Sequence, residues 1–584
     1  MERRPKPQDL SVQPYDSGPI VYRLWSVALT LGGLMAFVGV PPMETSRRYL
    51  LPPPADVLLV GGRVYPLWPT PDAVVSAVAI RQGRIAALGS DEELRAWRGP
   101  RTRVIDLRGA TALPGLTDAH VHLASLGRLR RQLVLTGTRS KEEVLQRLRT
   151  YARRHPNLSW IVGRGWDQND WPDPHMPDRA DLDRVVPDRP VYLIRIDGHA
   201  AWVNTKALEQ ADIGPASPDP PGGRILRRPD GSPTGVLLDR AAELVQRVMP
   251  EPTVEDLMAD LEAGARACTE VGLTGVHDAG ISPATWAAYV RLVERDRLPI
   301  RVYAMAMYRS GLDEQLLTEG PLIGLGDGRL TLRAIKVLSD GALGSRGAAL
   351  LEPYADEPDS TGLLLVEPDE LVRLARRALD AGVQLAVHAI GDRANRMVLD
   401  AFEVAFRERP CGDCRFRIEH AQVVHPQDIP RLARLGVVPS MQPTHATSDM
   451  PWAPDRLGPD RLQGAYAWRS ILQTGLKIAG GSDAPVEEIS PLLGLYAAVT
   501  RQDLQGRPAG GWRPEERVTP QEALQMFTQW AAYAAFEEFQ RGTLRPGTWA
   551  DLTVLDGDPF QVEPRQIPHL RVRLTMVGGR IVYE

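Results

Sequence analysis

The chain has 584 residues, of which 43% are hydrophobic and 24% are charged, and its formal net charge is −4. This length and composition are typical of a globular protein with more than one structural domain. The slightly acidic balance provides no basic surface for nucleic acid. Three cysteines are too few for a disulfide framework, and the C-x-x-C pair of Cys411 and Cys414 is interpreted as two loop thiols without a role.

The N-terminal part is predicted to be an apolar segment followed by a linker, over residues 1–54. A polar stretch with four basic residues precedes an almost purely apolar run from Leu24 to Val40. This order resembles a signal peptide or a short anchor, so export or membrane association through residues 24–40 is one expectation. The alternatives are a true start at Met43, with a cytoplasmic protein, and a helix docked on the rest of the chain.

Short strand-like runs with glycine turns follow over residues 55–112, and a similar pattern returns over residues 541–584. The phrase V-G-G-R-V-Y in the first segment is echoed by V-G-G-R-I-V-Y in the last. Alternating apolar residues between such turns are typical of antiparallel strands. Because chain ends often lie near each other, we expect both segments to form one small β-sandwich beside a central domain.

The central segment, residues 113–540, is predicted to be an α/β domain of the (β/α)8 TIM-barrel type. Strand-like runs alternate there with amphipathic helices such as residues 369–382 and 394–409, and repeated βα units imply a parallel sheet. An insertion at about 125–265 is too long for a loop and is expected to form a subdomain over the barrel mouth. Eight strands are predicted, at 111–123, 272–280, 300–307, 332–341, 383–391, 416–422, 437–443 and 477–485.

The first predicted barrel strand ends in a histidine pair. His120 and His122 are separated by one residue, and alternate residues of a strand face the same side. Both imidazoles can therefore point into the barrel and share a metal ion. Taken alone, an H-x-H pair is equally compatible with chance or with a packed pair.

Four further groups strengthen the prediction of a metal site. Lys336 lies inside an otherwise apolar strand, where a lysine needs a partner or a depressed pKa. His388, His420 and Asp483 each lie near the C-terminal end of a predicted strand, which is where barrel enzymes carry their catalytic groups. Nitrogen and carboxylate ligands suit zinc best, with manganese or iron as alternatives.

The ordered set of motifs D-A-H-V-H, K-x-x-x-D-G, H-A-I-G-D, R-I-E-H-A-Q and G-S-D-A-P resembles the amidohydrolase superfamily. It is most similar to the YtcJ-like branch, which includes N-substituted formamide deformylases. The resemblance covers roughly residues 55–584. The set in this order is specific, although each motif alone is not.

The resemblance implies two divalent metal ions, zinc in the first place, and a role for each ligand. His120 and His122 would bind the more buried ion. Lys336, carboxylated on its side-chain nitrogen (N6) as in similar enzymes, would bridge the two ions. His388 and His420 would bind the second ion.

Asp483 would ligate the first ion and move the proton. The metals would lower the pKa of a water molecule that attacks a carbonyl carbon, while Asp483 would accept its proton and return it to the leaving nitrogen. A variant with a single metal, in which His388 or Lys336 is idle, stays open.

Residues outside this set are candidates for substrate contact or for structural roles. His199, in the segment R-I-D-G-H, resembles a residue that the family places over the pocket, and Trp166 and Asp167 are further candidates for substrate binding. His277 is expected to be packed or to support a ligand. The remaining histidines are expected to be structural or exposed: His155, His175, His425, His445 and His569.

The predicted function is hydrolysis of a non-peptide C–N bond, an amide or formamide, in a small molecule. The tryptophans of the insertion, with Trp171 and Trp202 beside Trp166, would favour an aromatic or apolar substituent. A lactonase or phosphotriesterase-type hydrolase on the same barrel is the alternative, followed by a non-catalytic barrel protein. The expected partner is a small-molecule substrate and not nucleic acid, and a homo-oligomer stays open.

Overall fold

Eight parallel strands form the central sheet of the structure, a computed structural model in which residues 52–584 are described. Hydrogen bonds pair neighbouring strands in chain order, and the Val121–Ala484 bridge brings the last strand segment back to the first. The predicted (β/α)8 barrel is therefore confirmed. Its strands are β7 (Leu116–Val121), β14 (Leu273–Ile281), β15 (Arg301–Met307), β17 (Leu330–Leu338), β18 (Gln384–Ala389), β19 (Arg417–His420), β20 (Val438–Met441) and β21 (Ala479–Gly480).

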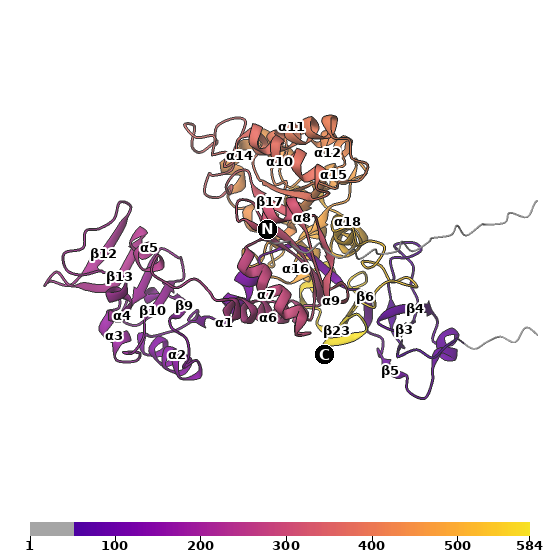
Figure 1. Cartoon of the computed structure of the whole chain (residues 1–584), viewed down its shortest axis with the longest axis horizontal. Coiled ribbons are helices and arrows are strands. Elements are labelled where there is room, and N and C mark those ends of the chain that lie inside the picture. Colours follow the sequence, from indigo (N-terminus) through magenta and orange to yellow (C-terminus); the bar gives the residue numbers. More distant parts are fainter. Residues whose placement is uncertain (1–51) are drawn as a thin grey trace, which may run out of the picture. The chain divides into compact units, whose positions relative to one another are not determined.

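Helices follow most of the barrel strands (Figure 1). The longer ones bury one apolar face. In α10, for example, proline occupies the first turn, where its missing N–H is tolerated, and Leu371, Leu374 and Ala378 recur at helical spacing on the buried side. A short strand, β16 (Leu322–Gly324), pairs with β17 outside the barrel. The helices are α1 (Leu123–Arg131), α6 (Val254–Glu270), α7 (Pro283–Glu294), α8 (Leu312–Glu319), α9 (Leu325–Gly328), α10 (Pro368–Asp380), α11 (Asp392–Glu408), α12 (Ile429–Leu435), α13 (Pro443–Asp449), α14 (Ala453–Arg461), α15 (Trp468–Leu472), α16 (Pro491–Thr500), α17 (Pro520–Met526) and α18 (Gln529–Ala534).

The insertion after the first barrel strand has a six-stranded sheet of its own. Helices α2 and α3 pack in the apolar core on one face of this sheet, and α4 and α5 in the core on the other. On either side of the insertion, α1 and α6 approach so closely that a side chain at Gly127 would collide with the backbone of Asp260. In chain order the elements are β8 (Leu133–Val134), α2 (Lys141–Arg154), β9 (Ile161–Trp166), α3 (Arg179–Asp183), β10 (Val191–Arg195), β11 (Ala200–Val203), α4 (Thr205–Gln210), β12 (Gly223–Arg227), β13 (Pro233–Asp239) and α5 (Arg240–Gln246).

Both ends of the described chain contribute to a β-sandwich, as the sequence predicts. One sheet has the order β4-β3-β1-β5, and the other, β2-β6-β22-β23-β24, combines early and late strands. Leu59, Val78, Leu552 and Met576 belong to the apolar core that the two sheets share. The strands are β1 (Val57–Val60), β2 (Arg63–Val64), β3 (Ala77–Arg81), β4 (Arg84–Gly89), β5 (Arg103–Asp106), β6 (Thr111–Pro114), β22 (Leu552–Leu555), β23 (Val572–Val577) and β24 (Arg580–Tyr583).

Two expectations about the rest of the chain have different outcomes. The signal or anchor expected at residues 24–40 lies outside the described residues. In the part that is described, residues 52–584, no helix combines the length and the apolar character needed to cross a membrane. The expectation of two loop thiols is wrong, because Cys411 and Cys414 form a disulfide, with their Cα atoms 5.8 Å apart and so within bridging range.

Candidate metal centre

The residues predicted as metal ligands gather at one end of the barrel. His120 lies in β7 and His122 directly after it, and Asp483 follows β21. The carboxyl ends of parallel strands lie at the same end of a barrel, so these side chains converge although they are far apart in the sequence. The remaining three predicted ligands come from the intervening strands: Lys336 from β17, His388 from β18 and His420 from β19.

Backbone hydrogen bonds fix the first and last parts of this group against each other. The N–H of Asp483 donates to the carbonyl of His120 at 2.7 Å, and the N–H of His122 donates to the carbonyl of Ala484 at 2.8 Å. Asp483 and His420 both adopt left-handed backbone conformations, with φ of 60° and 73°. Such conformations are rare for residues other than glycine and occur preferentially at functional sites.

One group of donors surrounds the first of the two Asp483 carboxylate oxygens. Asp483 Oδ1 lies 3.2 Å from His122 Nε2 and 3.5 Å from His120 Nε2. The Nζ atom of Lys336 lies 3.1 Å from His120 Nε2. Lys336 is only 2% exposed, and its burial lowers its pKa to about 8. These four side chains therefore present nitrogen and oxygen atoms to one small volume.

His420 connects this group to two further histidines. Its ring centroid lies 4.7 Å from that of His120 and 4.7 Å from that of His388. On its other side it stacks on His445, with centroids 5.9 Å apart and ring planes 20° apart. Sequence reasoning assigned His445 a structural or exposed role, but the structure places it among the predicted ligands.

The protonation states and the unpaired atoms of this centre fit a divalent metal. Burial lowers the pKa of His120 to about 4 and holds that of His420 well below its ordinary value. Burial alone would raise the pKa of Asp483, but the surrounding histidines, with His122 first, hold it well below its usual range. Neutral imidazoles and an ionised carboxylate are the forms that bind metals. Asp483 Oδ1 and the Nε2 atoms of His388 and His445 are buried without a hydrogen-bond partner in the described chain.

Below the centre, a buried ion pair orients His120. Glu419 Oε2 lies 2.5 Å from His120 Nδ1, and the Nε atom of Arg417 donates to Glu419 Oε1 at 2.7 Å. Burial opposes ionisation of Glu419, but Arg417 and then His120 hold its pKa well below the ordinary value. An ionised carboxylate can only accept, so Nδ1 of His120 carries the hydrogen and Nε2 faces the centre with its lone pair. Arg417 also contacts His277 Nδ1 at 2.9 Å, in keeping with the supporting role expected for that histidine.

The three predicted substrate-binding residues belong to the insertion. Trp166 has no exposed surface and packs with Trp171 and Trp202 in the insertion's own core. Asp167 pairs with Arg195 at 2.6 Å. His199 is exposed, and its Nδ1 lies 2.8 Å from Asp239 Oδ1. Within residues 52–584 no hydrogen bond or ion pair joins Trp166, Asp167 or His199 to the predicted ligands, and their contact with substrate stays a prediction.

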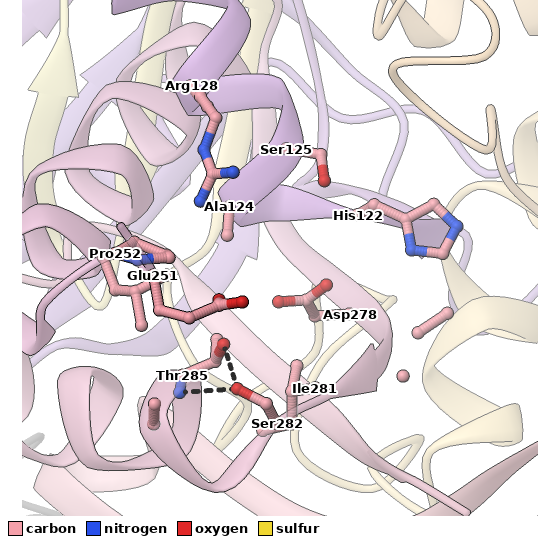
Figure 2. Close-up of a pocket in the computed structure, with 14 residues that line it drawn as sticks. His122, Ala124, Ser125, Arg128, Glu251, Pro252, Asp278, Ile281, Ser282 and Thr285 are labelled. Carbon is pink, nitrogen blue, oxygen red and sulfur yellow. Dashed lines mark hydrogen bonds between the residues drawn. The ribbon is translucent and has the colours of Figure 1, made fainter. Parts of the chain in front are cut away.

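A cavity of about 500 Å³ adjoins His122 (Figure 2). It lies between the β7–α1 and β14–α7 connections, with Pro252 and Leu257 on a third side. Figure 2 shows the carboxyl groups of Glu251 and Asp278 pointing toward each other, with Arg128 and His122 at the margins. None of the 14 residues that line it is a tryptophan, tyrosine or phenylalanine, and hydroxyl groups come from Ser125, Ser282 and Thr285.

A parallel barrel with this donor set at its carboxyl end defines a metal-dependent hydrolase. The model of the amidohydrolase family matches residues 103–583, and the chain belongs to that family. The resemblance seen in the sequence is thereby confirmed.

Individual relatives match over nearly their whole length. The amidohydrolase-family protein YtcJ of Bacillus subtilis (strain 168) is 37% identical over 533 residues, which are 90% of this chain and 98% of YtcJ. The N-substituted formamide deformylase of Arthrobacter pascens is 30% identical over 536 residues, 88% of this chain and 96% of that enzyme. The crystal structure of a metal-dependent hydrolase from Pyrococcus furiosus is 30% identical, with a TM-score of 0.73, and covers 86% of this chain and 100% of its own.

Proposed function

We propose that the protein hydrolyses the C–N bond of a small N-substituted amide, most simply a formamide, at the centre beside His122. The observation that carries the proposal is that the cavity adjoins the group of donors, so a substrate in the cavity can present its carbonyl to them. The cavity has the volume of a small-molecule site. The Arthrobacter pascens relative, named for its action on N-substituted formamides, supports the choice of bond.

The residues that would hold metal are the six that the sequence predicts. We propose two divalent ions, preferably zinc, with His120, His122 and Asp483 at one and His388 and His420 at the other. Bound metal would lower the pKa of water and polarise the substrate carbonyl. Lys336 is buried with a pKa near 8, so more of its amine is neutral at neutral pH than in an exposed lysine, and the neutral amine is the form that carbon dioxide carboxylates. We propose that modification as the bridge between the ions.

Asp483 is the group that we assign to proton transfer. It is ionised and nearly buried beside His122, so it can accept a proton from the attacking water. The backbone hydrogen bond from its N–H to His120 keeps its carboxylate beside the histidines. The same carboxyl group would then donate the proton to the leaving nitrogen.

The cavity also bears on the substituent of the substrate. The expected aromatic walls do not line it, because Trp166 and Trp202 are enclosed in the core of the insertion. The lining instead combines apolar Leu257 and Ile281 with hydroxyl and charged groups. This mixture favours a short alkyl substituent or one that carries a polar group. His199 and Asp167 remain proposed as contacts made from the insertion, whereas Trp166 has no exposed surface to offer a substrate.

The test is a substrate screen on purified protein loaded with Zn²⁺ or Mn²⁺. N-alkyl and N-aryl formamides, other amides, lactones and phosphotriesters are compared, with chelated protein as the control. We expect turnover of amides that is lost on chelation. Ala124→Phe, which narrows the cavity by adding a ring to its lining, should raise KM by ~10-fold or more, because even one extra methylene in a pocket costs about that much. Turnover of esters or phosphotriesters with none of any amide would refute the proposed reaction.

A further inference from the structure

His445 lies just beyond the end of the seventh barrel strand, at a position where no ligand is predicted from the sequence. Helix α13 (Pro443–Asp449) begins almost directly after β20 (Val438–Met441), so His445 lies at the same carboxyl end as the six predicted ligands. Its side chain is 11% exposed. Within residues 52–584, no hydrogen bond, ion pair or ring contact joins the other histidines assigned structural or exposed roles to these ligands, so His445 differs from them in its surroundings.

The imidazole of His445 faces Asp483 without a partner of its own. Its Nε2 atom lies 3.7 Å from Asp483 Oδ2, beyond hydrogen-bond distance, and makes no hydrogen bond within the described part of the chain. A polar group that is left buried and unpaired destabilises the folded protein. The ring is held almost parallel to that of His420. The position of His445 therefore suits an imidazole nitrogen that gains a partner only when a metal ion or another molecule binds beside it.

The two oxygens of Asp483 face two different groups of histidines. Oδ1 is closest to His122 and His120, whereas Oδ2 faces His445. One atom each from His120, His122 and Asp483 lie within 4.8 Å of one another, and so do one atom each from His420, His445 and Asp483. Two sets of three donors thus share one carboxylate.

His388, the expected second histidine at the outer ion, already has a carboxylate beside it. Its Nε2 lies 3.3 Å from Asp340 Oδ1, and Asp340 also accepts hydrogen bonds from the N–H groups of Ala349, Ile390 and Gly391. Nε2 of His388, like that of His445, makes no hydrogen bond within residues 52–584, but the carboxylate nearest to His445 is that of Asp483. The set of metal-binding atoms around His420 thus includes His445, which is not one of the six ligands predicted from the sequence.

We propose that His445, together with His420 and Asp483, binds a divalent transition-metal ion at the outer part of the centre. Two imidazole nitrogens and a carboxylate oxygen form a set that suits zinc and cobalt. This inference rests on the proposed metal-dependent function but does not depend on which bond is hydrolysed. His445 would then be a direct ligand, where the resemblance assigns only His388 and His420.

The experiment introduces a spectroscopic label at this position. His445→Cys replaces the imidazole by a thiol, and a thiolate bound to Co²⁺ gives a charge-transfer band in the near ultraviolet. The native cysteines do not compete, since Cys268 is buried and Cys411 and Cys414 form a disulfide. His175→Cys, at an exposed histidine of the insertion, is the matched control. We expect the band in Co²⁺-loaded H445C and not in H175C.

Metal binding by His445→Ala supplies the second measurement. Loss of a direct ligand should weaken the affinity for the outer ion by more than the roughly 10- to 100-fold seen on loss of an outer hydrogen-bond partner. Thermal unfolding of each variant checks that it folds. If H445C does not fold, the metal affinity of H445A decides whether His445 is a ligand. Absence of the band in folded H445C overturns the proposal, as does unchanged metal affinity in H445A with a lowered kcat/KM, which would make His445 a substrate contact. Neither readout needs a substrate, so failure of the amide assay is a separate result.

Discussion

Replacing Glu419 should separate what the buried ion pair does for stability from what it does for metal binding. Glu419 has no exposed surface and contacts both Arg417 and His120. In Glu419→Leu the guanidinium of Arg417 stays buried beside His277 and Ser440 without its carboxylate. The Nδ1–H of His120 also loses its acceptor, so nothing holds its Nε2 lone pair toward the centre.

The loss of stability and the loss of metal affinity in E419L can each be estimated. Removing one partner of a buried pair destabilises a protein by about 3–5 kcal/mol, because an uncompensated charge remains. Removing the outer acceptor of a metal-binding histidine lowers metal affinity roughly 10- to 100-fold. Replacing both members of the pair by apolar residues is often neutral for stability. The double variant Arg417→Met/Glu419→Leu should therefore recover most of the lost stability and none of the lost metal affinity.

The assay is urea unfolding of metal-free protein, combined with Zn²⁺ titration against a competing chelator, for the wild type, E419L and the double variant. The stability of E419L should be low and that of the double variant close to wild type, while both bind zinc weakly. If zinc affinity recovers together with stability in the double variant, Glu419 acts only through folding. If E419L binds zinc with the affinity of the wild type, the orientation of His120 does not depend on Glu419.

Other substitutions test the remaining assignments. Asp483→Asn should lower kcat by ~10²-fold or more, as expected for a general acid–base group, and steady-state kinetics on an amide would measure it. Lys336→Ala should lower the occupancy of the second ion, and unchanged metal content by elemental analysis would contradict a bridging lysine. His199→Ala should lower kcat/KM at unchanged metal content, and loss of metal would argue for a different role. Asp551→Asn should destabilise the protein at neutral pH, because Asp551 pairs with buried Arg301 at 2.7 Å. Burial opposes ionisation of Asp551 but Arg301 holds its pKa below 3.8, so the wild-type advantage is full above that value and shrinks as pH falls below it, which urea unfolding at two pH values would show.

The barrel and the positions of the six predicted ligands at its carboxyl end were predictable because both are encoded locally. Each barrel strand is a short apolar run bounded by turns. A histidine or aspartate at the end of such a run can be recognised without knowing which strands lie beside it. Lys336 stood out because a lysine in an apolar strand is unusual. The order of the strands then places all six residues at one end of the barrel.

The residues that the sequence did not reveal depend on contacts across the barrel. Arg417 and Glu419 alternate in a buried strand, as inward-facing residues do, and two charges there were a usable signal. Their partners, however, are His120 in β7 and Ser440 in β20, and no local sequence pattern predicts these contacts. His445 lies in a short helix, whose direction is set by packing. The tryptophans of the insertion were predicted as pocket walls because aromatic residues suit both a core and a binding site, and only packing distinguishes the two.

Closure of the barrel and assembly of the centre are one structural event. His120 and Asp483 lie more than 360 positions apart in the chain, yet their backbones are joined by the hydrogen bond that brings the last strand segment to the first. The left-handed backbone of Asp483 is tolerated because this bond and the adjoining one from His122 to Ala484 determine it on both sides. A metal ion held by His122 and Asp483 would therefore cross-link the first and last strands at the point where the sheet closes. For that reason the closed barrel as a whole determines the geometry of the predicted ligands. A substitution that weakens the contact between the first and last strands should therefore lower metal affinity even where it touches no predicted ligand.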